Sequence, residues 1–133
     1  MLLSIFIVLI ILYSLVAIKV DEWISISALG FKTETPQLFL INPGRYSFIR
    51  TILFLGALAT SFFLPIRLSI CFIFLYIVWL GAHWVGRKLA IKTYRRVLNE
   101  MASEESDPKQ KSEFELASRK SDKELINEIL AAL

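Results

Sequence analysis

The chain has 133 residues, of which 56% are hydrophobic and only 20% are charged. No Asp or Glu occurs between Thr35 and Asn99, a gap that the surface of an ordinary water-soluble domain would not leave. This composition excludes such a domain, and the placement of the cations beside apolar segments argues against nucleic-acid binding. We expect an all-α integral membrane protein with an N-terminal transmembrane helix, a transmembrane helical hairpin and amphipathic cytoplasmic C-terminal helices.

The first predicted element is a transmembrane helix at residues 1–18, which contain no charged side chain. As a helix these residues would be about 27 Å long, close to the ~30 Å thickness of the hydrocarbon core of a bilayer. A cleaved signal peptide is the alternative. However, no basic residue precedes Lys19, and Leu15 stands two residues before Ala17, where a small residue is expected. These features favour a retained anchor.

Residues 19–50 are predicted to form a cytoplasmic or interfacial segment, because they are too apolar for a free linker. The alternation of apolar and polar residues at Trp23–Ser27 indicates a short strand, and Gln37–Ile41 is a second short apolar run. The sequence Asn42-Pro43-Gly44 indicates a turn before the next span.

Residues 51–66 and 68–86 are predicted to form a transmembrane hairpin with Arg67 at its turn. One straight helix through both would be about 54 Å long and would bury Arg67 at a cost of ~2.5–3.5 kcal/mol. Pro65 favours a break at this point because it lacks an N–H group. Small residues should let the two arms approach closely; they are Gly56, Ala59, Thr60, Gly81 and Ala82.

Residues 87–102 continue the helical period as a basic amphipathic juxtamembrane helix. Its cations suit contact with anionic lipid headgroups; they are Arg87, Lys88, Lys92, Arg95 and Arg96. Simple continuation of the third span into the cytoplasm is an equal alternative. Residues 103–120 are predicted to form a polar linker, because Asp107–Lys111 contains a proline and breaks the periodic pattern.

Residues 121–133 are predicted to form an amphipathic docking helix. Ser121 and Glu124 have the spacing of a capping box. Five aliphatic side chains then share one face; they are Leu125, Ile126, Ile129, Leu130 and Leu133. A helix this short is marginal alone in water, so we expect this face to dock on this chain, on another copy or on a different protein.

The distribution of cations predicts the orientation. With three spans, residues 19–50 and the stretch after the third span lie on one face and hold nine cations, whereas the other face has Arg67 alone. Positive charge favours the cytoplasmic side. We therefore expect the N-terminus outside and the C-terminus in the cytoplasm, in a bacterial inner membrane.

The sequence contains no recognisable motif for a catalytic, metal or cofactor site. Cys71 lies inside an apolar run and is expected to act as a small apolar residue. His83 suits a proton relay or an axial cofactor ligand, but no carboxylate near it in the sequence could orient its ring. We therefore expect an interfacial histidine, bonded to backbone or water, whose replacement by Gln is tolerated.

The leading hypothesis is a non-catalytic small subunit or assembly factor of a larger membrane complex, and not an enzyme. Its partners would be other membrane-protein subunits, a cytoplasmic protein at the C-terminal helix, anionic lipids and a second copy of the chain. In its layout alone the chain resembles three-span phage holins, which are also small, with the N-terminus outside and a charged cytoplasmic tail. Its segment after the first span is longer than that layout implies. A holin-like or pore-forming homo-oligomer is therefore the alternative, and an enzyme or transporter subunit with His83 in a relay is the third class.

Overall fold

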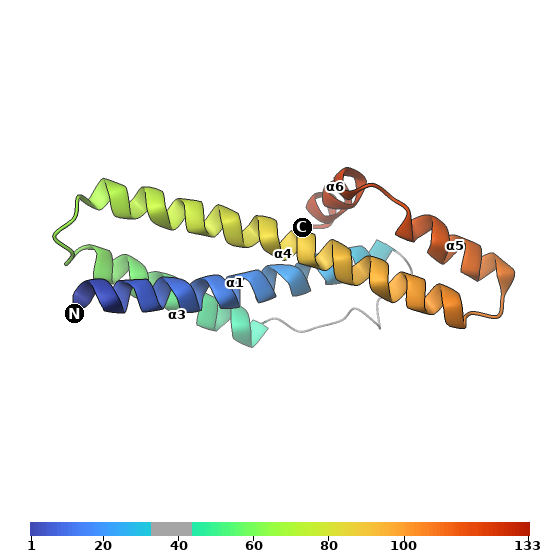
Figure 1. Ribbon diagram of the computed structural model, residues 1–133, viewed down its shortest axis with the longest axis horizontal. Coiled ribbons are helices and arrows are strands. Elements are labelled where there is room, and N and C mark those ends of the chain that lie inside the picture. Colours follow the sequence, from blue (N-terminus) through green and yellow to red (C-terminus); the bar gives the residue numbers. More distant parts are fainter. Residues whose placement is uncertain (33–43) are drawn as a thin grey trace. The chain divides into compact units, whose positions relative to one another are not determined.

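The computed structural model describes residues 1–32 and 44–133. These residues contain helices and no β-strand, so the all-α class is confirmed for them. The helices are α1 (Leu2–Lys32), α3 (Gly44–Ser61), α4 (Leu68–Glu104), α5 (Pro108–Ser118) and α6 (Asp122–Ala132) (Figure 1).

Helix α1 continues well beyond residue 18, where the first span was predicted to end. The strand predicted at Trp23–Ser27 is wrong, because these residues lie within α1. Ile26 and Leu29 are both buried, and a spacing of three residues places them on one face of a helix. Five alternating residues were too few to distinguish this pattern from that of a strand. The apolar run Gln37–Ile41 and most of the predicted Asn42–Gly44 turn lie outside the described residues.

Helices α3 and α4 form the predicted hairpin, which breaks between Ser61 and Leu68. The chain tightens after Ser61, where the amides of Phe62 and Phe63 bond to carbonyls three residues earlier, at 3.3 and 3.1 Å. Pro65 then has no N–H to continue the helix. Helix α3 therefore ends before residue 66, the predicted end of this span. It also begins earlier than predicted, at Gly44 instead of residue 51. Arg67 is exposed at the turn, as expected.

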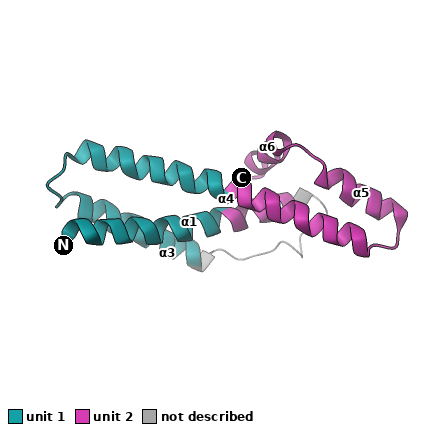
Figure 2. Cartoon of the chain, viewed as in Figure 1, with its two compact units in different colours: residues 1–21, 42–86 teal, residues 22–41, 87–133 magenta. Residues whose placement is uncertain are grey.

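The chain forms two compact units (Figure 2). Unit 1 comprises residues 1–21 and 42–86, and unit 2 comprises residues 22–41 and 87–133. Helices α1 and α4 contribute residues to both units.

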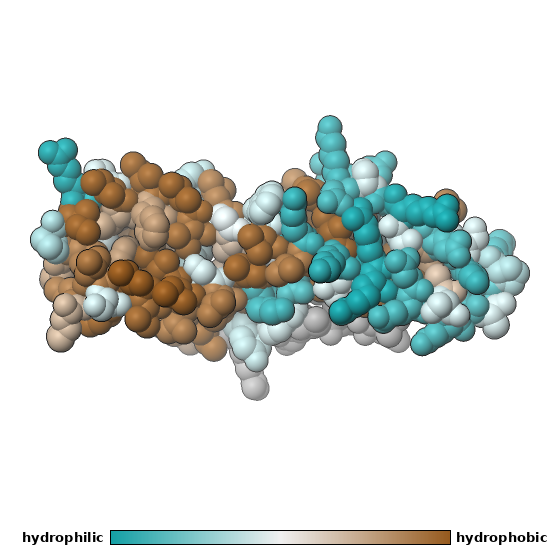
Figure 3. All heavy atoms as spheres, in the orientation of Figure 1, coloured by the Kyte–Doolittle hydropathy of each residue, from teal (hydrophilic) through white to brown (hydrophobic). Residues whose placement is uncertain are grey.

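Large apolar side chains cover the exterior of unit 1. In α4, for example, Ile70, Ile73 and Ile77 are 55%, 61% and 59% exposed. Two helical stretches, Leu2–Gly30 and Leu68–Glu104, are long and apolar enough to cross a membrane, and Tyr46–Ser61 is a shorter apolar helix. Only 28% and 17% of the apolar windows of the two long stretches are buried, unlike the mostly buried core helix of a soluble protein. Figure 3 shows hydrophobic residues gathered over unit 1 and hydrophilic ones over unit 2.

Small residues pack the three helices of unit 1 together, but not all of them are the predicted ones. Ala17, Ala57 and Ala82 are buried, one from each of α1, α3 and α4. Of these only Ala82 was predicted.

The other predicted packing residues have different positions. A Cβ added to Gly56 would lie 3.6 Å from Leu9 of α1, so Gly56 faces α1. The Thr60 hydroxyl donates to the Gly56 carbonyl at 2.7 Å. Ala59 and Gly81 are exposed, and a Cβ on Gly81 would meet nothing within 4 Å. Their expected role in packing the arms together is therefore wrong, because the helices turn these two positions outward.

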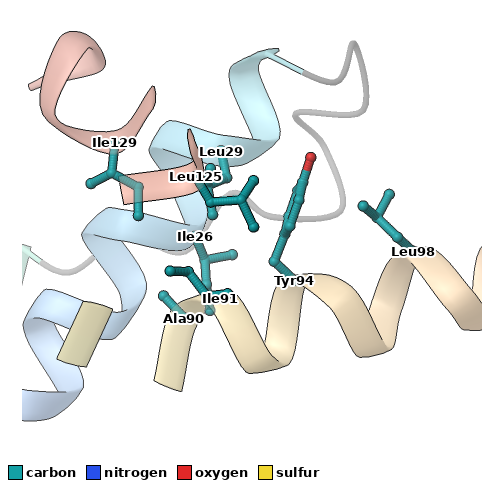
Figure 4. Packing of buried hydrophobic residues seen from close by; sticks show 8 residues of the cluster. All are labelled: Ile26, Leu29, Ala90, Ile91, Tyr94, Leu98, Leu125 and Ile129. Atoms are coloured by element: carbon teal, nitrogen blue, oxygen red, sulfur yellow. The ribbon is translucent and has the colours of Figure 1, made fainter. Parts of the chain in front are cut away.

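The core of unit 2 joins α6 to the second half of α1 and to α4 (Figure 4). Its buried members are Ile26, Leu29, Ala90, Ile91, Tyr94, Leu98, Leu125 and Ile129. An 11-residue helix such as α6 is marginal alone in water, so these contacts hold it in place.

Part of the segment predicted as a polar linker, residues 103–120, is helix α5. Asp107 caps this helix, and its side chain accepts from the Lys109 amide at 3.0 Å. Pro108 occupies the start of the helix, where its missing N–H costs nothing. The proline thus begins a helix, and Phe114 and Ala117 of α5 pack against the core of unit 2.

The predicted capping box of α6 is confirmed. The Glu124 amide donates to the Ser121 hydroxyl oxygen at 3.3 Å, and the Ser121 amide donates to the Glu124 carboxylate at 2.8 Å. This backbone hydrogen bond, with a second from the Ser121 hydroxyl, lowers the pKa of Glu124.

Replacing Ser121 by Ala is expected to destabilise α6 by about 1 kcal/mol, so its amide hydrogens should exchange about fivefold faster. Acid should act in the same direction. The folded-state pKa of Glu124 is lowered. Its contribution to the stability of α6 is therefore complete above the ordinary glutamate pKa and is lost as the pH falls through the lowered value. The measurement is amide hydrogen exchange of α6 at each pH, compared between the parent chain and the Glu124→Gln variant. Ser103→Ala, which removes an exposed hydroxyl outside α6, should leave α6 unchanged.

Candidate functional site

Three ionisable side chains meet inside unit 1, each from a different helix. Asp21 of α1 lies between Arg50 of α3 and His83 of α4. One carboxylate oxygen, Oδ1, is 3.4 Å from Nη1 of Arg50, and the other, Oδ2, is 2.9 Å from Nδ1 of His83. The cluster therefore connects all three helices of the unit.

The cluster is shielded from solvent. The Asp21 side chain is 10% exposed, and those of His83 and Arg50 are 24% and 25% exposed. A carboxylate with so little water requires an opposite charge or hydrogen-bond donors. Arg50 supplies both at Oδ1, whereas His83 lies close to Oδ2 without a hydrogen bond to it.

The His83 ring is fixed from two sides. Trp79, one turn earlier in α4, packs edge-on against it, with ring centroids 4.5 Å apart and an interplanar angle of 86°. On the other side, Nδ1 lies at ion-pair distance from Oδ2 of Asp21, without the geometry of a hydrogen bond. The Asp21 carboxylate and the Trp79 indole therefore hold the imidazole between them.

The prediction that no carboxylate would orient His83 is therefore wrong. Asp21 was placed in a segment beyond the first span, and the hairpin itself contains no acid, so sequence distance concealed the pair. The pair forms because α1 continues as a helix through Asp21, and no local sequence motif indicated that continuation. The same reasoning missed Glu22, whose carboxylate accepts from the Thr93 hydroxyl at 3.3 Å within unit 2.

The predicted docking residues of α6 divide into two groups. Leu125 and Ile129 are fully buried in the core of unit 2, and Ile126 packs against that core. Leu130 and Leu133 are 51% and 67% exposed. The centre of the stripe therefore packs on this chain itself, the first of the three expected targets.

The predicted basic residues lie on α4, which runs without a break through residues 87–102. The structure therefore shows continuation of the helix, the second of the two alternatives. Its apolar face, which includes Ile91, Tyr94 and Leu98, is buried within unit 2, so this face is not available to lipid.

Individual cations on this stretch differ in their contacts. Arg95 donates to the Lys120 carbonyl at 2.7 Å and pairs with Asp122 at 2.6 Å, so it anchors the start of α6. Arg96 lies 4.0 Å from Glu100 on the same helix. Arg87 is half-buried, whereas Lys88 and Lys92 are exposed.

Cys71 is buried among apolar side chains of unit 1, where a small apolar residue was expected.

A comparison of the chain with protein-family models, with curated proteins and with solved structures finds no match.

Proposed function

We propose that this chain is a non-catalytic small subunit or assembly factor of a larger membrane complex, with unit 1 in the bilayer and unit 2 in the cytoplasm. The observation that carries this proposal is the contrast between the two exteriors. Unit 1 turns large aliphatic and aromatic side chains outward and keeps Asp21 and His83 inside. An exterior of this kind suits a membrane or a partner protein rather than water.

The proposed topology has three spans. Arg67 lies at the turn on the outer side, together with the N-terminus, and the C-terminus lies in the cytoplasm of a bacterial cell. The third apolar helix, Tyr46–Ser61, is about 24 Å long by its helical rise, so Arg50 near its start would lie at headgroup depth.

The arrangement of polar groups favours a subunit over a holin-like pore. A pore built from several copies needs polar side chains on the faces that line it. Here Asp21, Arg50 and His83 converge within one copy and contact one another. They therefore stabilise the three-helix bundle instead of lining an oligomeric channel.

Recruitment of a cytoplasmic partner would use the exposed part of the α6 stripe, Leu130 and Leu133. The double variant Leu130→Asp/Leu133→Asp should insert and fold, because neither side chain is in the core, but should lose the partner. Purification in gentle detergent followed by identification of bound proteins is the measurement. Leu116→Asp on α5 replaces a leucine that is 65% exposed and is the matched control.

The outcome that contradicts the proposal is equally clear. A chain that purifies without other proteins, and that abruptly depolarises the membrane when expressed, would be a pore former. Retention of every partner by the double variant would contradict the role of α6.

The pair of Asp21 and His83 favours a second candidate, a proton-handling role within a membrane complex. A carboxylate that orients an imidazole is the arrangement such a role requires. His83→Gln keeps a polar side chain beside Asp21 but cannot exchange a proton at neutral pH. This candidate therefore predicts loss of function at normal protein level, whereas a purely structural cluster predicts little change.

A further inference from the structure

Two adjoining cavities form a groove on unit 1. The larger has a volume of about 350 Å³ and is lined by Phe54, Leu58, Phe72, Leu75, Tyr76 and Trp79. The smaller, of about 170 Å³, is lined by Tyr13, Arg50, Thr51, Phe54 and Trp79. Phe54 and Trp79 line both cavities, so the two lie next to each other.

The two cavities of the groove differ in polarity. The larger cavity has an aliphatic and aromatic lining, and its volume is in the range of ligand pockets, about 300–1,000 Å³. The smaller cavity adds two hydroxyl-bearing residues, Tyr13 and Thr51, and the guanidinium of Arg50. Arg50 is the sole charged residue among the described residues that line it.

Arg50 retains the capacity to bind an anion in this position. It contacts Asp21 through Nη1 at 3.4 Å, and a guanidinium has five N–H donors. Asp21 does not line the cavity, although its charge acts on Tyr13, one of the lining residues.

We propose that this groove binds an anionic phospholipid, with one acyl chain in the larger cavity and the headgroup phosphate on Arg50. This inference rests on the proposed membrane location of unit 1. A phospholipid matches the groove because it joins an apolar chain to an anion at one end. A partner helix or a second copy would bring an apolar side chain to the smaller cavity and would leave the Arg50 N–H groups that do not face Asp21 without an acceptor.

Trp79 allows a direct test because it lines both cavities. The full chain with Trp23→Phe and Trp84→Phe keeps Trp79 as its one tryptophan. It is reconstituted in phosphatidylcholine vesicles that contain a small mole fraction of brominated phosphatidylglycerol or, in the second arm, brominated phosphatidylcholine. Brominated chains quench tryptophan on contact. Phosphatidylglycerol should quench Trp79 at about fivefold lower mole fraction, the factor that corresponds to ~1 kcal/mol for one cation at the headgroups.

Variants separate the two ends of the groove. Arg50→Gln should abolish the preference for phosphatidylglycerol, whereas Arg50→Lys, which keeps the charge, and Arg67→Gln, at the exposed hairpin turn, should retain it. Leu58→Phe fills the larger cavity without touching the pair of Asp21 and Arg50, and should weaken quenching by both lipids.

Three results would overturn the inference. Equal quenching by the two lipids in the parent chain would show a groove without headgroup selectivity. Absence of quenching by either lipid, in protein that floats with the vesicles, would show that a protein segment fills the groove. Protein that fails to float would contradict the proposed membrane location as well.

Discussion

Replacing Asp21 by Asn is expected to lower the free energy of unfolding by about 3 kcal/mol, because the change leaves the Arg50 guanidinium without its counter-charge in a poorly hydrated site. This is the lower end of the range for buried pairs, since Arg50 is 25% exposed. For a chain of this size the melting temperature in mild detergent should fall by roughly 10 °C.

The matched control is Asp122→Asn, which removes one partner of the exposed pair between Arg95 and Asp122. This variant should cost less than about 1 kcal/mol. The double variant Asp21→Asn/Arg50→Gln should be less destabilised than the sum of its two single variants, because the two residues are in contact. Strict additivity, or an effect of Asp21→Asn no larger than that of Asp122→Asn, would show that the cluster does not stabilise unit 1.

Replacing Ile129 by Asp should destabilise unit 2 by about 4 kcal/mol or more, because the fully buried side chain loses its apolar contacts and a carboxylate takes its place. Helix α6 should then detach and become sensitive to limited proteolysis. The next residue supplies the control. Leu130 is 51% exposed, so Leu130→Asp should change stability by no more than about 0.5 kcal/mol.

The sequence alone placed Ile129 and Leu130 on one docking face and did not distinguish between them. The structure separates the two effects, since Ile129 packs on α1 and α4 of its own chain. Equal protease resistance of the two variants, both at the level of the parent chain, would contradict the packing of α6 in this core.

The sequence was sufficient for the features that depend on local chemistry. Arg67 and Pro65 predicted the hairpin turn, and the spacing of Ser121 and Glu124 predicted the start of α6. Helix α5 was missed although Asp107 and Pro108 are residues that begin a helix. The proline was interpreted there as a breaker, because the apolar pattern around it was weak.

The candidate site could not be predicted because it depends on contacts between distant segments. Asp21 follows one span, and His83 ends another with no acid in its own hairpin. Only the length of α1 and its rotation bring the carboxylate to the imidazole, and neither follows from periodicity. The same limit applies to packing in unit 1, where Ala57 is buried and Ala59, two residues later, is exposed.

Cysteine accessibility in a Cys71→Ser background tests the central claim, that unit 1 spans the bilayer and unit 2 lies in the cytoplasm. Single cysteines replace Leu2, Ile73 and Leu133, all of which are exposed in the structure. A membrane-impermeant maleimide should label position 2 only from outside and position 133 only from the cytoplasmic side. It should not label position 73 from either side until detergent is added. Rapid labelling of position 73 in intact membranes, or labelling of both termini from the same side, would contradict the account.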